Sequence, residues 1–303
     1  MKCLVTELFN DAGIKALEAK GVEVTLAYGK SQEELKAMLP DYDALIVRAA
    51  TPVKKDMIDA GKKLKSIGMA GIGLNHIDVE YAKSKGIKVL NVPDGSTEAV
   101  AELALAVALS VMRKVVAADK AVRANKWDKT GFTGNEIRGK VVGIIALGKI
   151  GYRVAELYKA FGATIVTYDP YLKQEIADKI GAKILPLDEV FKQADIVSVH
   201  SPLTPETKHM IGKKQLNLMK KGSFVFNLGR GGVVDEDALY DALVSGQLAG
   251  AGADVMEVEP PVGSKLLGLD NFVVTCHIGA GSHEAQIYIG ESLAKQTLEV
   301  LGL

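Results

Sequence analysis

The sequence predicts an α/β protein of two domains, each a doubly wound parallel sheet, and three observations predict this fold class. The chain has 303 residues, which favours two domains over one. Short apolar runs alternate with amphipathic helical stretches along its whole length, a pattern typical of parallel strands covered by helices on both faces. Its 31 glycines stand singly or in small groups between these runs, where they indicate tight turns or close approach to a ligand.

The first alternating series predicts five strands. Amphipathic stretches such as 14–20 and 33–39 separate them and are expected to form helices. The strands are expected at Lys2–Thr6, Val22–Ala27, Ala44–Arg48, Ser66–Ala70 and Lys88–Val92. A domain break is expected near residues 93–100.

One long helical segment follows, from about Thr97 to Asn125, with apolar residues on most of its faces. Such a helix is usually buried between domains or between subunits. Six strands of a second series are then expected at Val141–Ala146, Thr164–Tyr168, Ile196–His200, Phe224–Leu228, Gly250–Asp254 and Phe272–Thr275. A closing helix is expected from about Ser282 to Leu301, with Ser282 as its N-cap.

The composition argues against several classes of protein. Its 37 Lys and Arg balance its 37 Asp and Glu, whereas a nucleic-acid binder needs a clustered basic surplus. No uncharged apolar run reaches the ~18 residues of a membrane span, and the N-terminus reads as a strand rather than a signal peptide. Cys3 and Cys276 offer neither a disulfide framework nor a zinc-type pair. We therefore expect a cytoplasmic protein with no nucleic-acid, membrane or metal partner.

The segment Val141–Gly151 nearly matches a dinucleotide-binding loop. Gly148 takes the position where backbone approaches a pyrophosphate, and Gly151 the position where helix packs on strand; the first glycine is replaced by Ala146. Asp169 ends the next strand, where a carboxylate can bind ribose hydroxyls and repel a 2′-phosphate, so NAD is favoured over NADP. The alternative is an ordinary tight turn followed by a helix-capping Asp.

Three ionisable residues follow strands of the second series, at the edge where open α/β sheets bind ligands. Arg230 suits a planar carboxylate, His277 suits proton transfer near neutral pH, and Glu259 could orient that histidine. Together they predict a site for a 2-hydroxy or 2-keto acid. Spacing alone leaves alternatives open, because Arg230 could be a solvated turn residue, Glu257 is equally acidic and His200 also ends a strand.

Several motifs in a fixed order give the chain a family resemblance. They are Val47–Thr51, Ala70–Asp78, Val100–Glu102, Trp127 with Phe132–Glu136, the loop 141–151, Asn227–Leu239, Asp254 with Glu259–Pro260, and His277–Ala280. With these motifs the chain resembles the D-isomer-specific 2-hydroxyacid dehydrogenases, and among them the phosphoglycerate dehydrogenases most closely.

The resemblance implies a Rossmann NAD-binding domain at 97–281 and a discontinuous, flavodoxin-like substrate domain at 1–96 plus 282–303. It implies that Arg230, Glu259 and His277 carry catalysis. The implied NAD contacts are Leu147, Gly148, Lys149, Ile150, Gly151, Asp169, Ser201, Leu228, Gly229, Arg230, Asp254 and His277. The implied substrate contacts are Arg48, Gly71, Ile72, Gly73 and Arg230. A homodimer through the long inter-domain helix is implied as well.

The expected reaction interconverts 3-phosphoglycerate and 3-phosphohydroxypyruvate, a step of serine biosynthesis. Met69 replaces the arginine common before the Ala-Gly loop, and Asn75-His76 replaces Asp-Asn, so a glyoxylate/hydroxypyruvate reductase or a D-lactate-type dehydrogenase is the alternative. Cys276 replaces a proline and is expected to be buried. A different class of protein, an NAD-sensing co-repressor-like scaffold, shares the fold. The chain ends after the closing helix, so no C-terminal regulatory domain and no serine feedback are expected.

Overall fold

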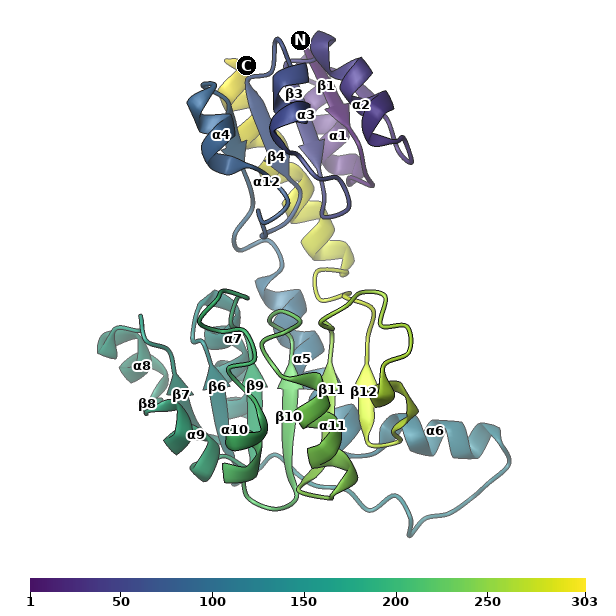
Figure 1. Ribbon diagram of the computed structural model, residues 1–303, viewed down its shortest axis with the longest axis vertical. Helices are drawn as coiled ribbons and strands as arrows, with labels where there is room; N and C mark the ends of the chain where they lie inside the picture. The colour runs from purple at the N-terminus through teal and green to yellow at the C-terminus, as the bar shows by residue number, and fades with distance from the viewer. The chain divides into compact units, whose positions relative to one another are not determined.

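The computed structural model describes residues 1–303, and the chain divides into two compact units (Figure 1). The first unit comprises Met1–Ser96 and Ala280–Leu303, and the second comprises Thr97–Gly279. Each unit is built on one parallel sheet, of five strands in the first and seven in the second. The predicted fold class, two doubly wound α/β domains, is confirmed.

The sheet of the first unit has the strand order β2-β1-β3-β4-β5. The chain adds β2 on one side of β1 and β3, β4 and β5 on the other, so the strand order changes direction between β1 and β3. Its strands are β1 (Lys2–Val5), β2 (Glu23–Leu26), β3 (Ala44–Val47), β4 (Ser66–Met69) and β5 (Lys88–Leu90). Its helices are α1 (Asp11–Glu18), α2 (Gln32–Met38), α3 (Lys55–Ala60), α4 (Val79–Ser84), α12 (His283–Leu301) and the short η1 (Leu39–Asp41).

Two apolar cores cover the two faces of this sheet. One joins the sheet to α1 and α12, and the other joins it to α2, α3 and α4. Helix α12 begins at the predicted N-cap, because Ser282 Oγ accepts a hydrogen bond of 3.1 Å from the Ala285 amide. The C-terminal helix therefore belongs to the N-terminal sheet, as a discontinuous unit requires.

The sheet of the second unit has the strand order β12-β11-β10-β9-β6-β7-β8. Its strands are β6 (Val141–Ile145), β7 (Thr164–Tyr168), β8 (Lys183–Ile184), β9 (Ile196–Val199), β10 (Ser223–Asn227), β11 (Leu248–Ala253) and β12 (Phe272–Val274). Its helices are α5 (Thr97–Met112), α6 (Val115–Arg123), α7 (Lys149–Ala160), α8 (Gln174–Ile180), α9 (Leu187–Gln193), α10 (Lys213–Leu218), α11 (Glu236–Val244) and η2 (Lys265–Gly268).

The alternation of side chains along β6 explains why this sheet needs helices on both faces. Val142 and Ile144 belong to the core formed with α5 and α7, whereas Ile145 belongs to the core formed with α9, α10 and α11. Successive strand residues point to opposite faces, so a strand that is apolar at every position is buried on both sides. The carboxyl ends of β6, β9, β10, β11 and β12 consequently share one edge, where the site residues follow.

Two elements differ from the predictions. The segment expected to be one helix from Thr97 to Asn125 is two helices, because Lys114 adopts φ 54° between α5 and α6. The Asn135 amide bonds the Met112 carbonyl at 2.8 Å, and Gly134 packs so closely on that carbonyl that a side chain there would clash. The returning chain thus caps α5 and stops it. The strand β8 was not predicted; it has only two residues.

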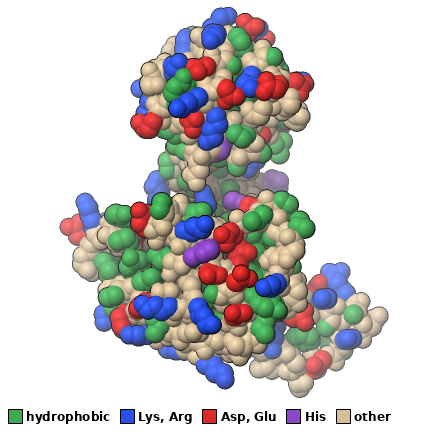
Figure 2. Space-filling model, viewed as in Figure 1, with side chains coloured by type: hydrophobic (Ala, Val, Ile, Leu, Met, Phe, Trp, Pro, Cys, Tyr) green, Lys and Arg blue, Asp and Glu red, His purple; other side chains and the backbone are tan.

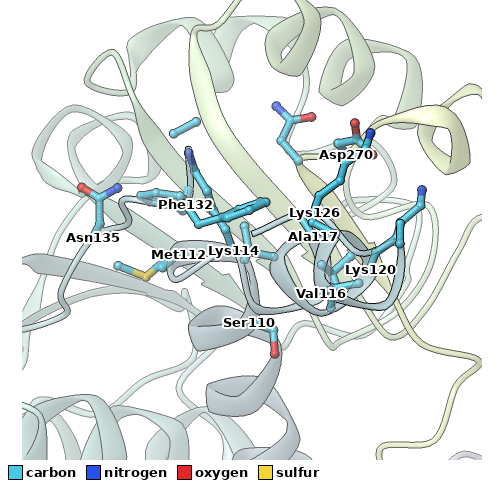
Figure 3. A pocket seen from close by; sticks show the side chains of 17 residues that line it. Ser110, Met112, Lys114, Val116, Ala117, Lys120, Lys126, Phe132, Asn135 and Asp270 are labelled. Atoms are coloured by element: carbon cyan, nitrogen blue, oxygen red, sulfur yellow. The ribbon is translucent and has the colours of Figure 1, made fainter. Parts of the chain in front are cut away.

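Helix α6 carries no buried residue in this unit. Val115, Val116, Val122 and the nearby Trp127 are exposed by 52%, 53%, 49% and 77%. Beside α6 lies a cavity of about 650 Å³ (Figure 3), whose lining includes Val116, Ala117, Phe132 and the cationic Lys114, Lys120 and Lys126. None of the helices in either unit has both the length and the apolar character to cross a bilayer.

Candidate functional site

The loop between β6 and α7 has the geometry of an anion-binding loop at a helix N-terminus. Gly148 is the N-cap of α7 and no side chain caps this helix, so its first amides are open to a ligand. A Cβ on Gly148 would meet no atom within 4 Å, whereas one on Gly151 would clash with the Ala146 carbonyl. Gly148 therefore borders open space and Gly151 lets helix and strand pack closely. Leu147 is buried, and Lys149 and Ile150 begin the helix.

Ala146 adopts φ 70°, a left-handed conformation that costs a residue with a Cβ roughly 1–2 kcal/mol. Ala146 therefore replaces the first glycine of the loop without keeping the negative φ that a residue with a Cβ prefers. The strand ladder fixes the residue, because its amide bonds the Tyr168 carbonyl at 2.9 Å. The loop thus keeps the geometry of a glycine loop without the first glycine.

Asp169 directly follows β7 and lies beside this loop. One of its oxygens accepts a hydrogen bond from the Leu147 amide at 3.0 Å and the other accepts one from the Tyr171 amide at 2.9 Å. A carboxylate can accept about four hydrogen bonds, so each oxygen can also accept one from a ribose hydroxyl. Asp169 therefore fits a dinucleotide and also fastens the glycine loop.

The ends of β9 and β10 bring the other predicted cofactor residues together. Gly229 approaches the backbone of Ser201 so closely that a Cβ would lie 2.6 Å from the Ser201 carbonyl oxygen. Ser201 Oγ is buried and has no hydrogen-bond partner, and Leu228 is buried while its amide bonds the Val199 carbonyl at 3.1 Å. The open backbone at Gly148, the Asp169 carboxylate and these small residues fit NAD.

A buried side chain that the sequence alone did not indicate holds the backbone of the loop that carries Arg230. Asn227, the last residue of β10, accepts a hydrogen bond from the Gly229 amide at 3.1 Å and donates one to the Arg230 carbonyl at 3.0 Å. The half-buried Arg230 guanidinium bonds the Gly229 carbonyl at 2.8 Å. An Asn that ends a strand two residues before Gly229 was the available signal, since Asn side chains often bond the backbone two residues on.

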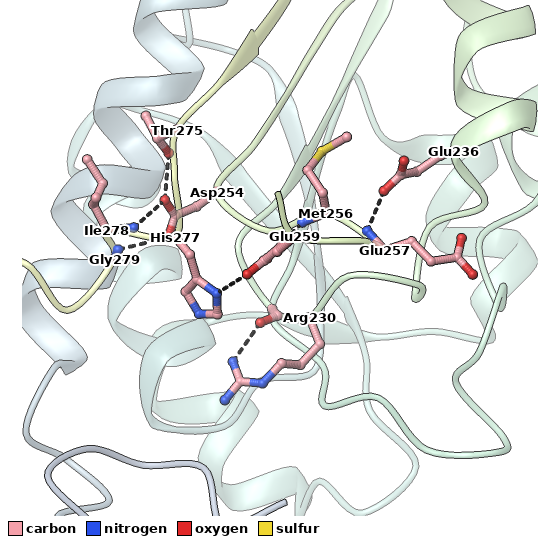
Figure 4. A network of polar contacts seen from close by, with 11 residues as sticks. Arg230, Glu236, Asp254, Met256, Glu257, Glu259, Thr275, His277, Ile278 and Gly279 are labelled. Atoms are coloured by element: carbon pink, nitrogen blue, oxygen red, sulfur yellow. Dashed lines mark hydrogen bonds and ion pairs between the residues drawn. The ribbon is translucent and has the colours of Figure 1, made fainter. Parts of the chain in front are cut away.

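His277 and Glu259 form the central polar contact of the second unit (Figure 4). His277 Nδ1 lies 2.8 Å from Glu259 Oε2. Because an ionised carboxylate only accepts, Nδ1 carries the hydrogen and donates it, and Nε2 is then the nitrogen that can exchange a proton with a ligand. The side chains are 49% and 39% exposed, so a small molecule can reach this pair.

Asp254 holds the turn that presents His277. Its buried carboxylate accepts hydrogen bonds from the Thr275 hydroxyl at 2.6 Å and from the amides of Ile278 and Gly279, both at 2.8 Å. The Asp254 carbonyl accepts a fourth, of 2.9 Å, from the His277 amide. His277 itself adopts φ 55°, a conformation that persists where surrounding contacts over-determine it. The predicted cofactor residue Asp254 is therefore also the anchor of this turn.

The structure separates His277 from the other histidine that ends a strand. Burial lowers the pKa of His200 to about 3, so this ring is neutral near pH 7. His200 Nε2 pairs with Ser198 Oγ at 2.9 Å, and its Nδ1 is buried without a partner. Likewise Glu257 pairs with His209 and not with His277.

The expectation that Cys276 is buried is wrong: the turn held by Asp254 leaves its thiol exposed.

The predicted substrate residues of the first unit follow β3 and β4. The amides of Arg48, Ala50 and Thr51 donate to the Glu7 carboxylate at 2.9, 3.1 and 2.9 Å. The Arg48 guanidinium bonds only the Leu8 carbonyl, at 3.4 Å, so its charge forms no ion pair. This loop is thus fixed by its backbone while the cation stays available to an anion.

The glycine loop after β4 has a fixed shape as well. The Gly71 amide donates a hydrogen bond of 2.8 Å to the Met69 carbonyl. The Ile72 carbonyl accepts a hydrogen bond of 2.7 Å from Asn91 Nδ2. The amides of Ile72 and Gly73 are therefore the donors left for a ligand carboxylate. Met69 is 7% exposed and adds no charge here.

The charge distribution accords with a small anionic ligand. Acidic and basic side chains are interspersed over the visible face of each unit (Figure 2), and the formal net charge is zero. An anion would therefore be recognised by individual arginines and backbone amides rather than by a basic surface.

Comparisons with known proteins agree with this geometry. Residues 105–279 match the family model described as D-isomer specific 2-hydroxyacid dehydrogenase, NAD binding domain. A D-3-phosphoglycerate dehydrogenase of Methanocaldococcus jannaschii is 44% identical over 99% of this chain, which spans only 57% of that relative's length. A hydroxypyruvate reductase of Thermotoga maritima is 45% identical over 90% of this chain and 89% of its own length. A crystal structure of Aquifex aeolicus D-lactate dehydrogenase complexed with NAD and lactic acid is 28% identical, covers 100% of this chain and 96% of its own, and superposes with a TM-score of 0.85.

Proposed function

Because the chain belongs to the D-isomer-specific 2-hydroxyacid dehydrogenases, we propose that it interconverts a D-2-hydroxy acid and its 2-keto acid with NAD. The observation that carries this proposal is the 2.8 Å contact between His277 Nδ1 and Glu259 Oε2. This contact leaves the other imidazole nitrogen, Nε2, for the substrate. Arg230 follows β10, which is the neighbour of β11 in the sheet.

In reduction, His277 Nε2 gives its proton to the carbonyl oxygen at carbon 2 of the keto acid. In oxidation, the neutral imidazole takes that proton back from the hydroxyl. The Arg230 guanidinium binds the substrate carboxylate bidentately and polarises the adjacent carbonyl. Glu259 keeps the imidazole oriented and stabilises its charged form. The nicotinamide, when bound, supplies or accepts the hydride, and Gly148, Gly151, Asp169 and Asp254 would hold the cofactor.

We propose 3-phosphoglycerate as the first substrate to test, which would place the protein in serine biosynthesis. Arg48 supports this choice, because its guanidinium forms no ion pair and would meet the phosphate, while the amides of Ile72 and Gly73 would hold the carboxylate. Hydroxypyruvate is the second candidate, because Met69 adds no charge near these residues and the Thermotoga relative is a hydroxypyruvate reductase.

NADH oxidation with phosphohydroxypyruvate, hydroxypyruvate, glyoxylate and pyruvate tests these proposals. If phosphohydroxypyruvate is the substrate, Arg48→Gln raises its KM at least about tenfold, because one charge-assisted contact is worth about 1.5–3 kcal/mol, and changes the KM for glyoxylate little. Lys63→Gln is the matched control, since Lys63 is an exposed cation of the same unit, 3.6 Å from Asp41. Turnover of none of the four acids, together with NADH-promoted peptide binding, would favour a co-repressor-like scaffold instead.

We also propose a homodimer in which a second copy covers α6. The exposed Val115, Val116 and Val122 and the cavity beside them support it, because an amphipathic helix without a buried face lacks a partner. Light scattering should give twice the mass of one chain, and Val116→Glu should halve it. The two free cysteines fit a reducing compartment, and we propose the cytoplasm, which cell fractionation tests.

A further inference from the structure

A set of three residues outside the site described above fixes the segment that carries Glu259, and one of the three belongs to that segment. Both carboxylate oxygens of Glu257 lie 3.1 Å from His209 Nε2. The Glu257 amide donates a hydrogen bond of 2.6 Å to Glu236 Oε1. We call His209, Glu236 and Glu257 the clamp. The segment from Met256 to Glu259 is thus held at Glu257 in two ways, through the backbone amide by Glu236 and through the side chain by His209.

The clamp also joins this segment to the loop that carries Arg230. The His209 amide donates to the Gly232 carbonyl at 2.7 Å, while the His209 ring holds Glu257. Gly231 packs so closely against the Met256 carbonyl that any side chain there would clash. Glu236 is the first residue of α11, just after its N-cap Asp235. One histidine therefore connects the two loops that carry Arg230 and Glu259.

A single further contact links the clamp to the acid–base pair. The Met256 amide donates a hydrogen bond of 3.0 Å to Glu259 Oε1, and the other oxygen of that carboxylate holds His277 (Figure 4). The Glu259 carboxylate therefore depends on where the Met256 amide lies. That amide belongs to the peptide bond between Val255 and Met256, directly before the peptide bond whose Glu257 amide is held by the clamp. A displacement of these two peptides would move the carboxylate away from His277 Nδ1.

The stability of the fold does not explain this arrangement. The His209 and Glu257 side chains are 39% and 37% exposed, and exposed ion pairs contribute only about 0–1 kcal/mol. His209 adopts φ 50°, and burial raises the pKa of the Glu236 carboxyl, which the charges of Glu257 and Asp237 raise further. Costly conformations and acids with a raised pKa collect where function requires them, and Glu236 is partly buried.

We propose that His209, Glu236 and Glu257 are positioning residues for the reaction, which set the Glu259 carboxylate against His277 and fix its spacing from the Arg230 loop. The proposal rests on the proposed function, because it gives these residues a role only through the His277–Glu259 pair. None of them is among the residues assigned above to the substrate or the cofactor.

The test compares Glu236→Ala and His209→Asn with the wild type, using NADH and whichever of the four keto acids is reduced fastest. Asn tolerates a positive φ and is too short to reach Glu257. Both variants should lower kcat about tenfold and leave the KM, the Kd for NADH and the thermal midpoint near wild type. Glu236→Gln should restore most of kcat, because its amide oxygen can still accept from the Glu257 amide. Asp237→Asn is the matched control, since Asp237 shares the turn of Glu236 but its side chain is 90% exposed.

A double-mutant cycle separates positioning from a general structural role. In a Glu259→Gln background, Glu236→Ala should change kcat less than about twofold, because the group that it positions is gone. Wild-type kcat in both clamp variants, or an equal loss with and without Glu259, overturns the proposal. If His209→Asn fails to fold, Glu257→Ala replaces it, because alanine removes the acceptor for His209 Nε2. Wild-type kcat in Glu259→Gln alone would instead overturn the proposed function.

Discussion

Asp254 and His277 are joined by a 2.9 Å hydrogen bond from the His277 amide to the Asp254 carbonyl, and the Asp254 carboxylate binds the two amides that follow His277. The left-handed backbone of His277 is therefore held from both sides of the residue. Its ring has a defined direction before any ligand binds, which is what electrostatic and acid–base preorganisation require.

Ala146→Gly should stabilise the protein. Ala146 adopts φ 70°, and glycine removes that strain at a smaller entropic cost, so the free energy of unfolding in urea should rise by about 0.5–1 kcal/mol. The matched control is Ala160→Gly at the exposed end of α7, where glycine should lower the free energy of unfolding by about 0.5–1 kcal/mol. A loss of stability in Ala146→Gly would contradict the assigned backbone conformation.

His200 should make the fold sensitive to mild acid. Its pKa is about 3 in the folded protein and about 6.5 in an unfolded chain, so unfolding takes up a proton at intermediate pH. The stability contributed by the neutral ring is complete above about pH 6.5 and is lost progressively as the pH falls toward 3. Between pH 7 and pH 5, the wild type should lose about 1–2 kcal/mol more unfolding free energy than His200→Gln. Parallel pH dependences of the two proteins would refute this assignment.

Asp169 should select NADH over NADPH. Asp169→Asn keeps an oxygen for the Leu147 amide but removes the charge that binds ribose hydroxyls and repels a 2′-phosphate. Fluorescence titration should show NADH binding about tenfold weaker, equal to about 1.4 kcal/mol, and NADPH binding no weaker than in the wild type. An unchanged ratio of the two Kd values would mean that Asp169 only fastens the loop.

Much of the fold could be predicted because its signals are local. Every expected strand is present within one or two residues, since buried parallel strands such as β6 are short, nearly continuous apolar runs. The break at Lys114 could not be predicted in this way. It depends on Gly134 and Asn135, which return from a distant loop to the Met112 carbonyl.

The site was predictable to the same extent. Arg230, Glu259 and His277 follow strands that share one sheet edge, so the topology brings them near one another, and family resemblance selected them among other ionisable residues. The clamp gave no comparable signal. His209 and Glu257 lie 48 positions apart in the sequence, and only the folded loops place a ring nitrogen against that carboxylate.

The most direct test of the account is the turnover of His277→Asn. Asparagine tolerates the left-handed backbone but cannot transfer a proton near neutral pH. With NADH and the best of the four keto acids, kcat should fall by about 10²–10⁴-fold, while the Kd for NADH from nicotinamide fluorescence and the thermal midpoint stay near wild type. A His277→Asn protein that binds NADH and keeps near-normal turnover would contradict the assignment of His277 as the proton donor.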